Sequence, residues 1–430
     1  MDRTLLVRAA VLYLPLVTAW LIWLLRQPPG RQAGAVLIAS LWNLFALLIL
    51  HHLSVLFGWW GYGAEGGLLL GFPVDLYIAW ILLWGTLPML ALPRAPLVLV
   101  VSLAFAVDVY LMPWTQPVVV LGTSWLTGEF VGLLIALLPA QLLGRWIAED
   151  RHLTARVGLL AVGFMTLTLW WLPSVIFALT DQGWGSFLAR SFWLNALALQ
   201  LLLIPGLVGA SAVLEFLRRG QGTPLPFDPP RRMVTSGIYA YLANPMQVSI
   251  ALVLVAWGAV LGSAWLSLAG VMAVIFGSGF AAWSEGQQLE ERFGQEWQDY
   301  RSHVHAWWPR WRPWAAIADE AQRPTIYIAE GCGPCSQIGG WVVSQQPIGL
   351  IVKAAEEHPQ RDLTRVTYQP ADGSGEEEGV AALGRAFEHL NLAWALLGMF
   401  IRLPVVSPLL QVLVDASGGG PQVVRRFRIE

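Results

Sequence analysis

The sequence predicts a polytopic α-helical membrane protein, with about nine transmembrane helices, that ends in a smaller α/β domain. Three observations predict this fold class. Hydrophobic residues make up 56% of the 430 residues and charged residues only 13%, which leaves too little polar side-chain area to cover a water-soluble globule. Long apolar runs recur along the chain as far as Trp283. After Pro324, short β-branched runs alternate with helical patterns.

Each predicted span is a run of about 17 to 25 mostly apolar residues, the length that crosses about 30 Å of hydrocarbon. The first run follows Arg3 and Arg8, but it is too long for the apolar part of a signal peptide and no small-residue cleavage site follows it. We therefore expect it to stay in the mature protein as a helix. The predicted spans are Thr4–Leu25, Ala33–Leu56, Gly67–Leu90, Pro96–Met112, Glu129–Ile147, Val157–Leu179, Trp193–Leu217, Pro245–Leu261 and Trp265–Trp283.

Arginines in the short loops predict the orientation, because loops rich in Lys and Arg stay in the cytoplasm. One alternating set of loops holds most of the arginines, whereas the opposite set holds only Arg190, and Arg3 before the first span is a second exception. We therefore expect a multi-pass protein of the cytoplasmic membrane with its N-terminus outside and everything after Trp283 in the cytoplasm. The net charge of −2 excludes a basic nucleic-acid binder.

Composition divides the chain into three predicted segments. Residues 1–217 are the N-terminal transmembrane helices. Residues 218–316 form a membrane core made of an interfacial loop, a helical hairpin and an amphipathic helix with Glu285 near its start. Residues 324–430 form the α/β domain, in which we expect "TIYIAE" and "LTRVTYQ" as strands and "SQIGGWVVSQQP" and "EEEGVAALGRAFEHL" as helices. The apolar tail after it is broken by Arg402, Pro404 and Pro408, so we expect packed or interfacial helices there and no tenth crossing.

The stretch "TSGIYAYLANPMQVS", Thr235 to Ser249, leads from a polar, proline-rich segment into the hairpin. Only "GSA" joins the two spans of that hairpin, so the chain must return to the membrane face from which it started. This return is expected to place Tyr239, Tyr241, Asn244 and Gln247 beside Glu285. The alternative is an ordinary interfacial loop, because tyrosines lie at headgroup level and Asn-Pro often begins a helix.

The same region resembles the integral-membrane methyltransferases related to isoprenylcysteine carboxyl methyltransferase and phospholipid methyltransferase. The resemblance covers roughly a quarter of the chain. Its pattern runs from "DPPRRMVTSGIYAYLANPMQVS" through the hairpin to "EGQQLEERFGQEWQDYRSHVHAWWP". The residues in register are Val234, Gly237, Tyr239, Tyr241, Pro245, Glu285, Leu289, Phe293, Gly294, Tyr300, Val304 and Pro309.

What the resemblance implies is an S-adenosylmethionine site on the cytoplasmic side and a lipid-soluble methyl acceptor in the bilayer. The chain departs from the family where an Arg-His pair becomes Ala243-Asn244, where a tyrosine becomes Gln247 and where the second glutamate of a pair becomes Gly286. Asn244 can form hydrogen bonds but cannot become a cation. For Glu285 the alternative is a helix-start acid capped by Ser284. The expected cofactor-binding residues are Gly237, Tyr239, Tyr241, Asn244, Pro245, Gln247 and Glu285.

Cys332 and Cys335 are the only two cysteines, and they stand in Cys-Gly-Pro-Cys between a predicted strand and a predicted helix. A helix N-terminus lowers the pKa of a first thiol, so we expect Cys332 to attack and Cys335 to resolve a mixed disulfide, with a protein thiol as a possible partner. Zinc binding would need ligands as distant as His358 and His389, and we predict no metal site. The domain resembles the thioredoxin-like fold, and more closely the DCC-type thiol-disulfide oxidoreductases. Two inert thiols in a turn are the alternative.

Three functions therefore stand open from the sequence. The first is an S-adenosylmethionine-dependent methyltransferase, and the second is a membrane-anchored thiol-disulfide oxidoreductase on a degenerate methyltransferase scaffold. The third is a non-enzymatic transport or assembly protein. Asp75, Asp108 and the pair His51-His52 lie in or near spans, where ionisable groups are costly, and they fit either a proton path or ordinary burial.

Overall fold

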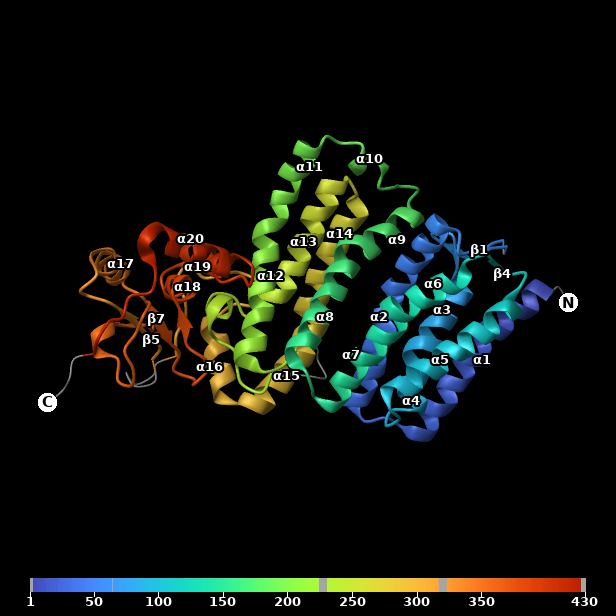
Figure 1. The fold of residues 1–430 in the computed structure, drawn as a ribbon, viewed down its shortest axis with the longest axis horizontal. Helices are drawn as coiled ribbons and strands as arrows, with labels where there is room; N and C mark the ends of the chain where they lie inside the picture. Colours follow the sequence, from blue (N-terminus) through green and yellow to red (C-terminus); the bar gives the residue numbers. More distant parts are fainter. Residues whose placement is uncertain (1–2, 64, 224–229, 317–322, 427–430) are drawn as a thin grey trace. The chain divides into compact units, whose positions relative to one another are not determined.

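The computed structural model describes residues 3–63, 65–223, 230–316 and 323–426, and the side chains of residues 280–285 and 287 lie outside that description. The chain forms two compact units, one within Met1–Leu188 and one from Ala189 to the C-terminal end (Figure 1). Each unit is described by itself.

The first unit is a bundle of apolar helices with short strands at its loops. Helix α2 is the most buried of its long helices, because Ala35, Ala39 and Ala46 let neighbouring helices approach closely. The elements are α1 (Arg3–Arg26), α2 (Gly30–Phe57), β1 (Trp60–Tyr62), β2 (Leu68–Leu69), β3 (Phe72–Pro73), α3 (Val74–Ile81), η1 (Leu82–Thr86), α4 (Leu87–Ala91), α5 (Leu97–Leu111), η2 (Met112–Thr115), β4 (Val119–Leu121), α6 (Trp125–Gly132), η3 (Leu133–Leu137), α7 (Leu138–Glu149), α8 (Leu153–Thr166), η4 (Leu167–Trp171), α9 (Leu172–Leu179) and α10 (Gly185–Leu188).

Three spans of this unit contain a wide π-helical turn just before a proline. The turns η1, η3 and η4 are followed by Pro88, Pro139 and Pro173 respectively. Proline has no N–H to donate, and its ring clashes with the carbonyl four residues earlier, so the preceding turn widens to accommodate it. Each proline therefore interrupts the regular helix without ending the span.

The second unit begins with membrane helices and continues into the C-terminal domain. Helices α12, α13 and α14 lie side by side (Figure 1). The elements are α11 (Phe192–Leu199), η5 (Gln200–Leu202), α12 (Leu203–Glu215), η6 (Phe216–Gly220), η7 (Gly237–Ala240), α13 (Pro245–Leu261), α14 (Ala264–Phe276), η8 (Gly277–Ala281), α15 (Ala282–Phe293), α16 (Gln295–His303), β5 (Thr325–Ile328), α17 (Gly333–Ser344), β6 (Ile351–Ala354), η10 (Ala355–Glu357), β7 (Thr367–Gln369), β8 (Glu377–Glu378), α18 (Val380–Phe387), α19 (Leu392–Ile401), α20 (Val406–Val414) and η11 (Asp415–Gly419).

The chain is a multi-pass membrane protein by the length and composition of its helices. Within the described residues, seven helical spans are long and apolar enough to cross a bilayer, and they coincide with the first seven predicted spans. The last two of the nine predicted spans are shorter helices, Pro245–Leu261 and Ala264–Gly279. In the tail, α19 and α20 meet at a bend of 86°, and an eighth span results only if that bent pair counts as one.

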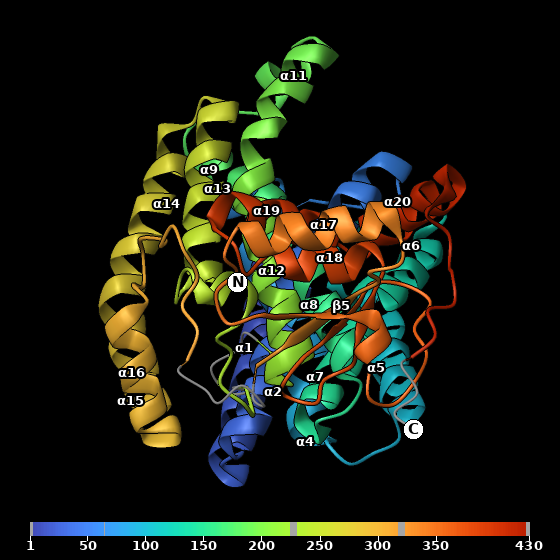
Figure 2. The same cartoon turned by 90° about the vertical axis from the view of Figure 1, so that its left-hand side faces the viewer.

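The C-terminal domain contains a four-stranded sheet in the order β6-β5-β7-β8. Strand β5 pairs with β6 in parallel, with Ile326 opposite Val352, and with β7 antiparallel, with Ile326 opposite Tyr368. Because α17 connects the two parallel strands, β5, α17 and β6 form a βαβ unit that precedes a β-hairpin and α18. Helices α17 and α18 lie on one face of this sheet, where Ile326 and Ile328 pack against Ala382 and Ala386 (Figure 2).

Strands β5 and β7 confirm the two predicted strands, but other elements of this domain differ from the sequence prediction. Strand β6 was not predicted, because "LIVKAA" is short and lacks clear alternation. Glu377 and Glu378 were expected to begin a helix, whereas they pair with β7 as β8, and the helix begins at Val380. The amphipathic segment after Trp283 is two helices, because Gly294 with φ of 53° ends α15 and leads into α16.

Candidate functional site

The helical hairpin brings the start of α13 and the end of α14 to the same end of the hairpin. Gly262 adopts φ of 72° after α13, which allows the chain to reverse directly into α14. At the other end of the hairpin, Gly277 lies against Gln247, so that a Cβ atom on Gly277 would lie 2.9 Å from Gln247 Oε1 and 3.0 Å from the Trp307 ring. The start of α13 and the end of α14 therefore meet, as the sequence predicts.

The loop before α13 is held by hydrogen bonds to its backbone amide and carbonyl groups. The Tyr300 hydroxyl on α16 donates to the Tyr239 carbonyl at 2.8 Å. The amide of Ala243 donates to the His305 carbonyl at 2.9 Å, and the amide of Arg310 donates to the Tyr241 carbonyl at 2.9 Å. This places the predicted loop next to the α16 segment. The side chain of Glu285, on the preceding helix α15, lies outside the described residues.

Gly237 is required at its position by both conformation and space. Its φ of 60° is a left-handed conformation, and a Cβ atom there would lie 2.8 Å from Cγ of the buried Glu215. Any other residue would push the loop away from α12. Gly237 therefore shapes the loop through its backbone.

The two predicted tyrosines are packed inside the second unit. Tyr241 is fully buried, and its hydroxyl donates to the Glu388 carbonyl at 2.9 Å. Burial is the main cause that raises the pKa of Tyr241, and the negative charge of Glu388 raises it further. Tyr239 is also buried, with its ring 5.4 Å from that of Phe216. Both rings pack where the loop, η6 and the C-terminal domain meet.

Asn244 and Gln247, on either side of the buried Pro245, form the more accessible part of the predicted site. Pro245 is the first residue of α13 and is buried, a position where the missing N–H costs no helical hydrogen bond. Asn244 Nδ2 donates to Gln247 Oε1 at 3.3 Å, and both side chains are half-buried. These neutral amides stand where the resembling family has a cation and a phenol, so any ligand here meets hydrogen-bonding groups without a formal charge.

A cluster of buried ion pairs was missed by the sequence analysis. Glu215 on α12 lies 2.5 Å from Arg385 on α18 and 3.3 Å from Arg402 at the bend after α19. Glu377 accepts from both arginines, and Glu388 does so as well. The sequence does contain a signal for this cluster, because Glu215 and Arg402 lie inside otherwise apolar runs. A charged side chain in such a run needs a partner of opposite charge when it is buried.

This cluster fixes the C-terminal domain on the membrane helix α12. Burial would raise the pKa of Glu377, but Arg385 and Arg402 outweigh burial and hold that pKa at about 2. Beside the cluster, a cavity of about 510 Å³ is lined by side chains that include Arg218, Arg219 and Ser374. Each of the three glutamates contacts both Arg385 and Arg402, and such a set of directional contacts makes the docking specific in orientation.

The cysteine pair lies at the start of α17. Cys332 occupies the N-cap position, Cys335 is in the first turn, and both are half-buried free thiols. Burial, followed by the hydrogen bond and charge of Cys332, raises the pKa of Cys335 to about 11. Just before the pair, the Glu356 carboxylate accepts from the amides of Glu330 and Gly331 at 3.4 Å each. Glu356 is thus an acidic side chain near the thiols that the sequence analysis did not select.

Comparison with known families identifies the region that contains this loop and hairpin. Residues 196–296 match the family model described as phospholipid methyltransferase. The matched segment, less than a quarter of the 430 residues, begins in α11, contains η7, α13, α14 and α15, and ends in α16. It supports a membrane methyltransferase core with a lipid-like substrate. No curated protein and no solved structure matches the chain.

Proposed function

We propose that the protein is an S-adenosylmethionine-dependent methyltransferase that acts on a lipid-soluble acceptor at the cytoplasmic face of the membrane. The observation that carries the proposal is the meeting of the loop before α13 with the end of α14, inside the segment that matches phospholipid methyltransferase. Such a corner between a bilayer-embedded hairpin and polar helices can receive a water-soluble cofactor on one side and a lipid on the other.

The residues present fit the cofactor in part. Tyr241 is engaged by Glu388, and Tyr239 packs on Phe216, so both tyrosines position the loop. The amides of Asn244 and Gln247 are the half-buried polar groups that would meet the cofactor, and Glu285 would hold its ammonium group. The backbone near Gly237 and the ring of Pro245 would shape the rest of the site.

Methyl transfer to an acceptor that is already an anion does not require a catalytic base. S-adenosylmethionine supplies a methyl group on a positively charged sulfonium, and transfer to a carboxylate or thiolate breaks one carbon–sulfur bond, forms one new bond and moves no proton. Alignment of the two reactants and exclusion of water then provide most of the acceleration. The packed aromatic loop and the apolar hairpin suit these two tasks.

The test is a calorimetric titration of S-adenosylmethionine into detergent-solubilised protein. We expect wild-type binding, and about 10- to 100-fold weaker binding by Glu285→Gln, because a hydrogen bond to a charged group contributes about 1.5–3 kcal/mol. Glu290→Gln is the matched control, since Glu290 is an exposed glutamate of the same helix. Absence of wild-type binding, or equal effects of the two substitutions, contradicts the proposal.

A second function, thiol-disulfide exchange, is favoured by the topology around the cysteines. The βαβ unit, the β-hairpin and α18, with Cys332 at the N-cap of the first helix, resemble the arrangement expected of a thioredoxin-like domain and support this proposal. Cys332 would attack a partner disulfide and release one partner thiol. Cys335 would then displace the second partner thiol, leaving a Cys332–Cys335 disulfide. With a pKa of about 11, Cys335 does not compete as the first nucleophile at neutral pH.

Oxidised glutathione tests this second function. Cys335→Ser keeps the attacking thiol and should accumulate a mixed disulfide with glutathione, whereas Cys332→Ser, the matched control, should not. Mass spectrometry of the intact protein measures both adducts. Equal labelling of the two variants, or none in either, rules out the assigned order of attack.

A further inference from the structure

Two acidic side chains are buried in the first unit without a basic partner among the described residues. Asp108 on α5 is 7% exposed and Glu129 on α6 is 1% exposed. Their carboxyl groups lie within hydrogen-bonding reach of each other. Among the described ion pairs, neither carboxyl group has an arginine or histidine within 4.0 Å. Two adjacent carboxylates cannot both stay charged in a low-dielectric interior, so this pair requires a proton or a cation.

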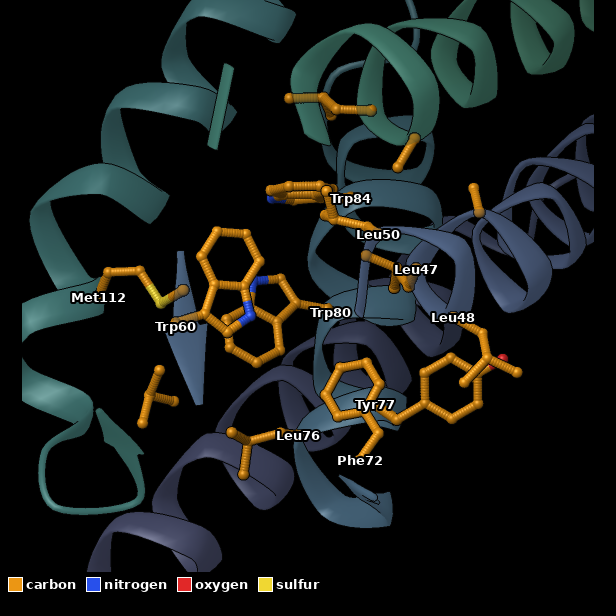
Figure 3. Close-up of a cluster of buried hydrophobic side chains, with 14 of the residues drawn as sticks. Leu47, Leu48, Leu50, Trp60, Phe72, Leu76, Tyr77, Trp80, Trp84 and Met112 are labelled. Carbon is orange, nitrogen blue, oxygen red and sulfur yellow. The ribbon is translucent and has the colours of Figure 1, made fainter. Parts of the chain in front are cut away.

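A small cavity beside Glu129 is lined mainly by aromatic side chains. Trp60, Trp80 and Trp84 come from separate elements and turn toward the interior of the bundle (Figure 3). The space open to the centre of a water-sized sphere is about 20 Å³. A cavity needs about 10–15 Å³ of such space to hold a water molecule, so this one has room for about one.

Three side chains that line this cavity, from different elements, each have a buried polar atom without a hydrogen-bond partner. These atoms are Glu129 Oε2, Trp84 Nε1 and His51 Nδ1, and each belongs to a lining side chain that is more than nine-tenths buried. His51 Nε2 lies 3.1 Å from the Leu70 carbonyl, which can only accept, so Nε2 donates and Nδ1 of the neutral ring accepts. Asp108 Oδ2 is unpartnered as well, whereas Asp108 Oδ1 accepts from Trp80 Nε1 at 2.9 Å.

The types of these atoms decide the ligand. The cavity offers one indole donor, one imidazole acceptor and one carboxyl group, a mixed set that a water molecule can satisfy by accepting once and donating twice. A metal ion does not suit an indole N–H. Moreover, no group of three or more His, Cys, Asp or Glu side chains in the described part of the chain could hold one. A single proton between the two carboxyl groups satisfies the remaining pair of acidic oxygens.

We propose that Asp108 and Glu129 form a proton-binding site in the first unit, with one proton shared between their carboxyl groups and one water molecule held in the adjoining cavity by Glu129, Trp84 and His51. This assignment gives a partner to each unpartnered atom named above. The other titratable side chain that faces Glu129 is Tyr62 on β1. Arg8 is engaged elsewhere, because it pairs with Asp75 at 2.5 Å between α1 and α3.

Infrared difference spectroscopy of the full chain in lipid nanodiscs tests the shared proton. At neutral pH we expect an absorption band of a protonated carboxyl group that shifts in D₂O and disappears in both Asp108→Asn and Glu129→Gln. In each variant the new amide takes the place of the protonated acid, so the other carboxyl group can remain ionised. Asp75→Asn is the matched control and should leave the band unchanged, because Asp75 is paired with Arg8.

Other outcomes overturn the proposal. Absence of the band in the wild type, or its full persistence in either folded variant, excludes a shared proton. A band that halves in each variant shows that each acid holds its own proton, which excludes sharing. Gel filtration checks folding, and one folded variant of the two is sufficient for the comparison.

Trp84→Phe tests the water molecule separately, because it removes the indole N–H and keeps an aromatic ring. We expect the carboxyl band to shift, since Glu129 then loses the donor that orients its water. Trp114→Phe, at a tryptophan that is 66% exposed, is the control. An unchanged band in Trp84→Phe removes the water molecule from the proposed site.

Discussion

Replacement of Glu215 by glutamine should loosen the C-terminal domain from the membrane helix α12. The Glu215 side chain is 3% exposed, and its carboxylate lies 2.5 Å from Arg385 and 3.3 Å from Arg402. It also accepts from the Ser236 hydroxyl at 3.1 Å. Glutamine keeps the size of the side chain but removes the charge, so two buried arginines lose one of their shared carboxylates.

The expected cost is about 3 kcal/mol. Removal of one partner from a buried ion pair costs about 3–5 kcal/mol. The lower end applies here because Glu377 and Glu388 still contact both arginines. A cost of about 3 kcal/mol corresponds to roughly a 100-fold increase in the fraction of molecules in which the C-terminal domain is detached from α12 and its helices are open to solvent.

Hydrogen exchange measured by mass spectrometry on peptides from α18 and α19 reads this population directly. We expect exchange roughly 100-fold faster in Glu215→Gln. Glu378→Gln is the matched control: Glu378 is 40% exposed and pairs with Arg361, which is 46% exposed, so its loss should cost less than about 1 kcal/mol.

The double variant Glu215→Gln, Arg402→Gln separates pairing from general damage. If the two groups interact as described, the double variant is less destabilised than the two single effects added together. Single effects that add to within about 0.5 kcal/mol, or an exchange rate in Glu215→Gln no faster than in the control, refute the reasoning.

Two further predictions concern the C-terminal domain. Gly398→Ala should destabilise it by about 1–3 kcal/mol, because a Cβ atom there would lie 2.2 Å from the Gly384 carbonyl oxygen and would push α18 and α19 apart. Hydrogen exchange in the peptides from α18 and α19 measures this effect. Gly340→Ala is the control and should not destabilise the domain, because nothing lies within 4 Å of the new Cβ atom. The domain should also lose stability as the pH falls from about 6.5 to about 4, because burial lowers the pKa of His389 to about 4 while the unfolded chain binds a proton from about 6.5. His389→Gln should flatten this dependence in unfolding experiments at graded pH, and an unchanged slope would exclude His389 as its source.

The sequence predicted much of the local structure because its signals are local. Apolar runs of sufficient length define the first seven spans, and "GSA" between two apolar runs predicts the hairpin that the structure contains. The strand at Thr325–Ile328 was equally readable from its β-branched residues.

Contacts between distant segments could be decided only by the tertiary structure. Glu215 and Arg402 are 187 residues apart, and no local pattern indicates that they share a buried ion pair. Likewise, the Tyr241 hydroxyl donates to the carbonyl of Glu388, a residue 147 positions later in the chain, and no local pattern indicates this contact. The pairing of Asp108 with Glu129 depends on how α5 and α6 pack. Hydropathy and turn chemistry act over a few residues, but the partner of a buried polar group is set by which helices pack together, and that is a property of the whole fold.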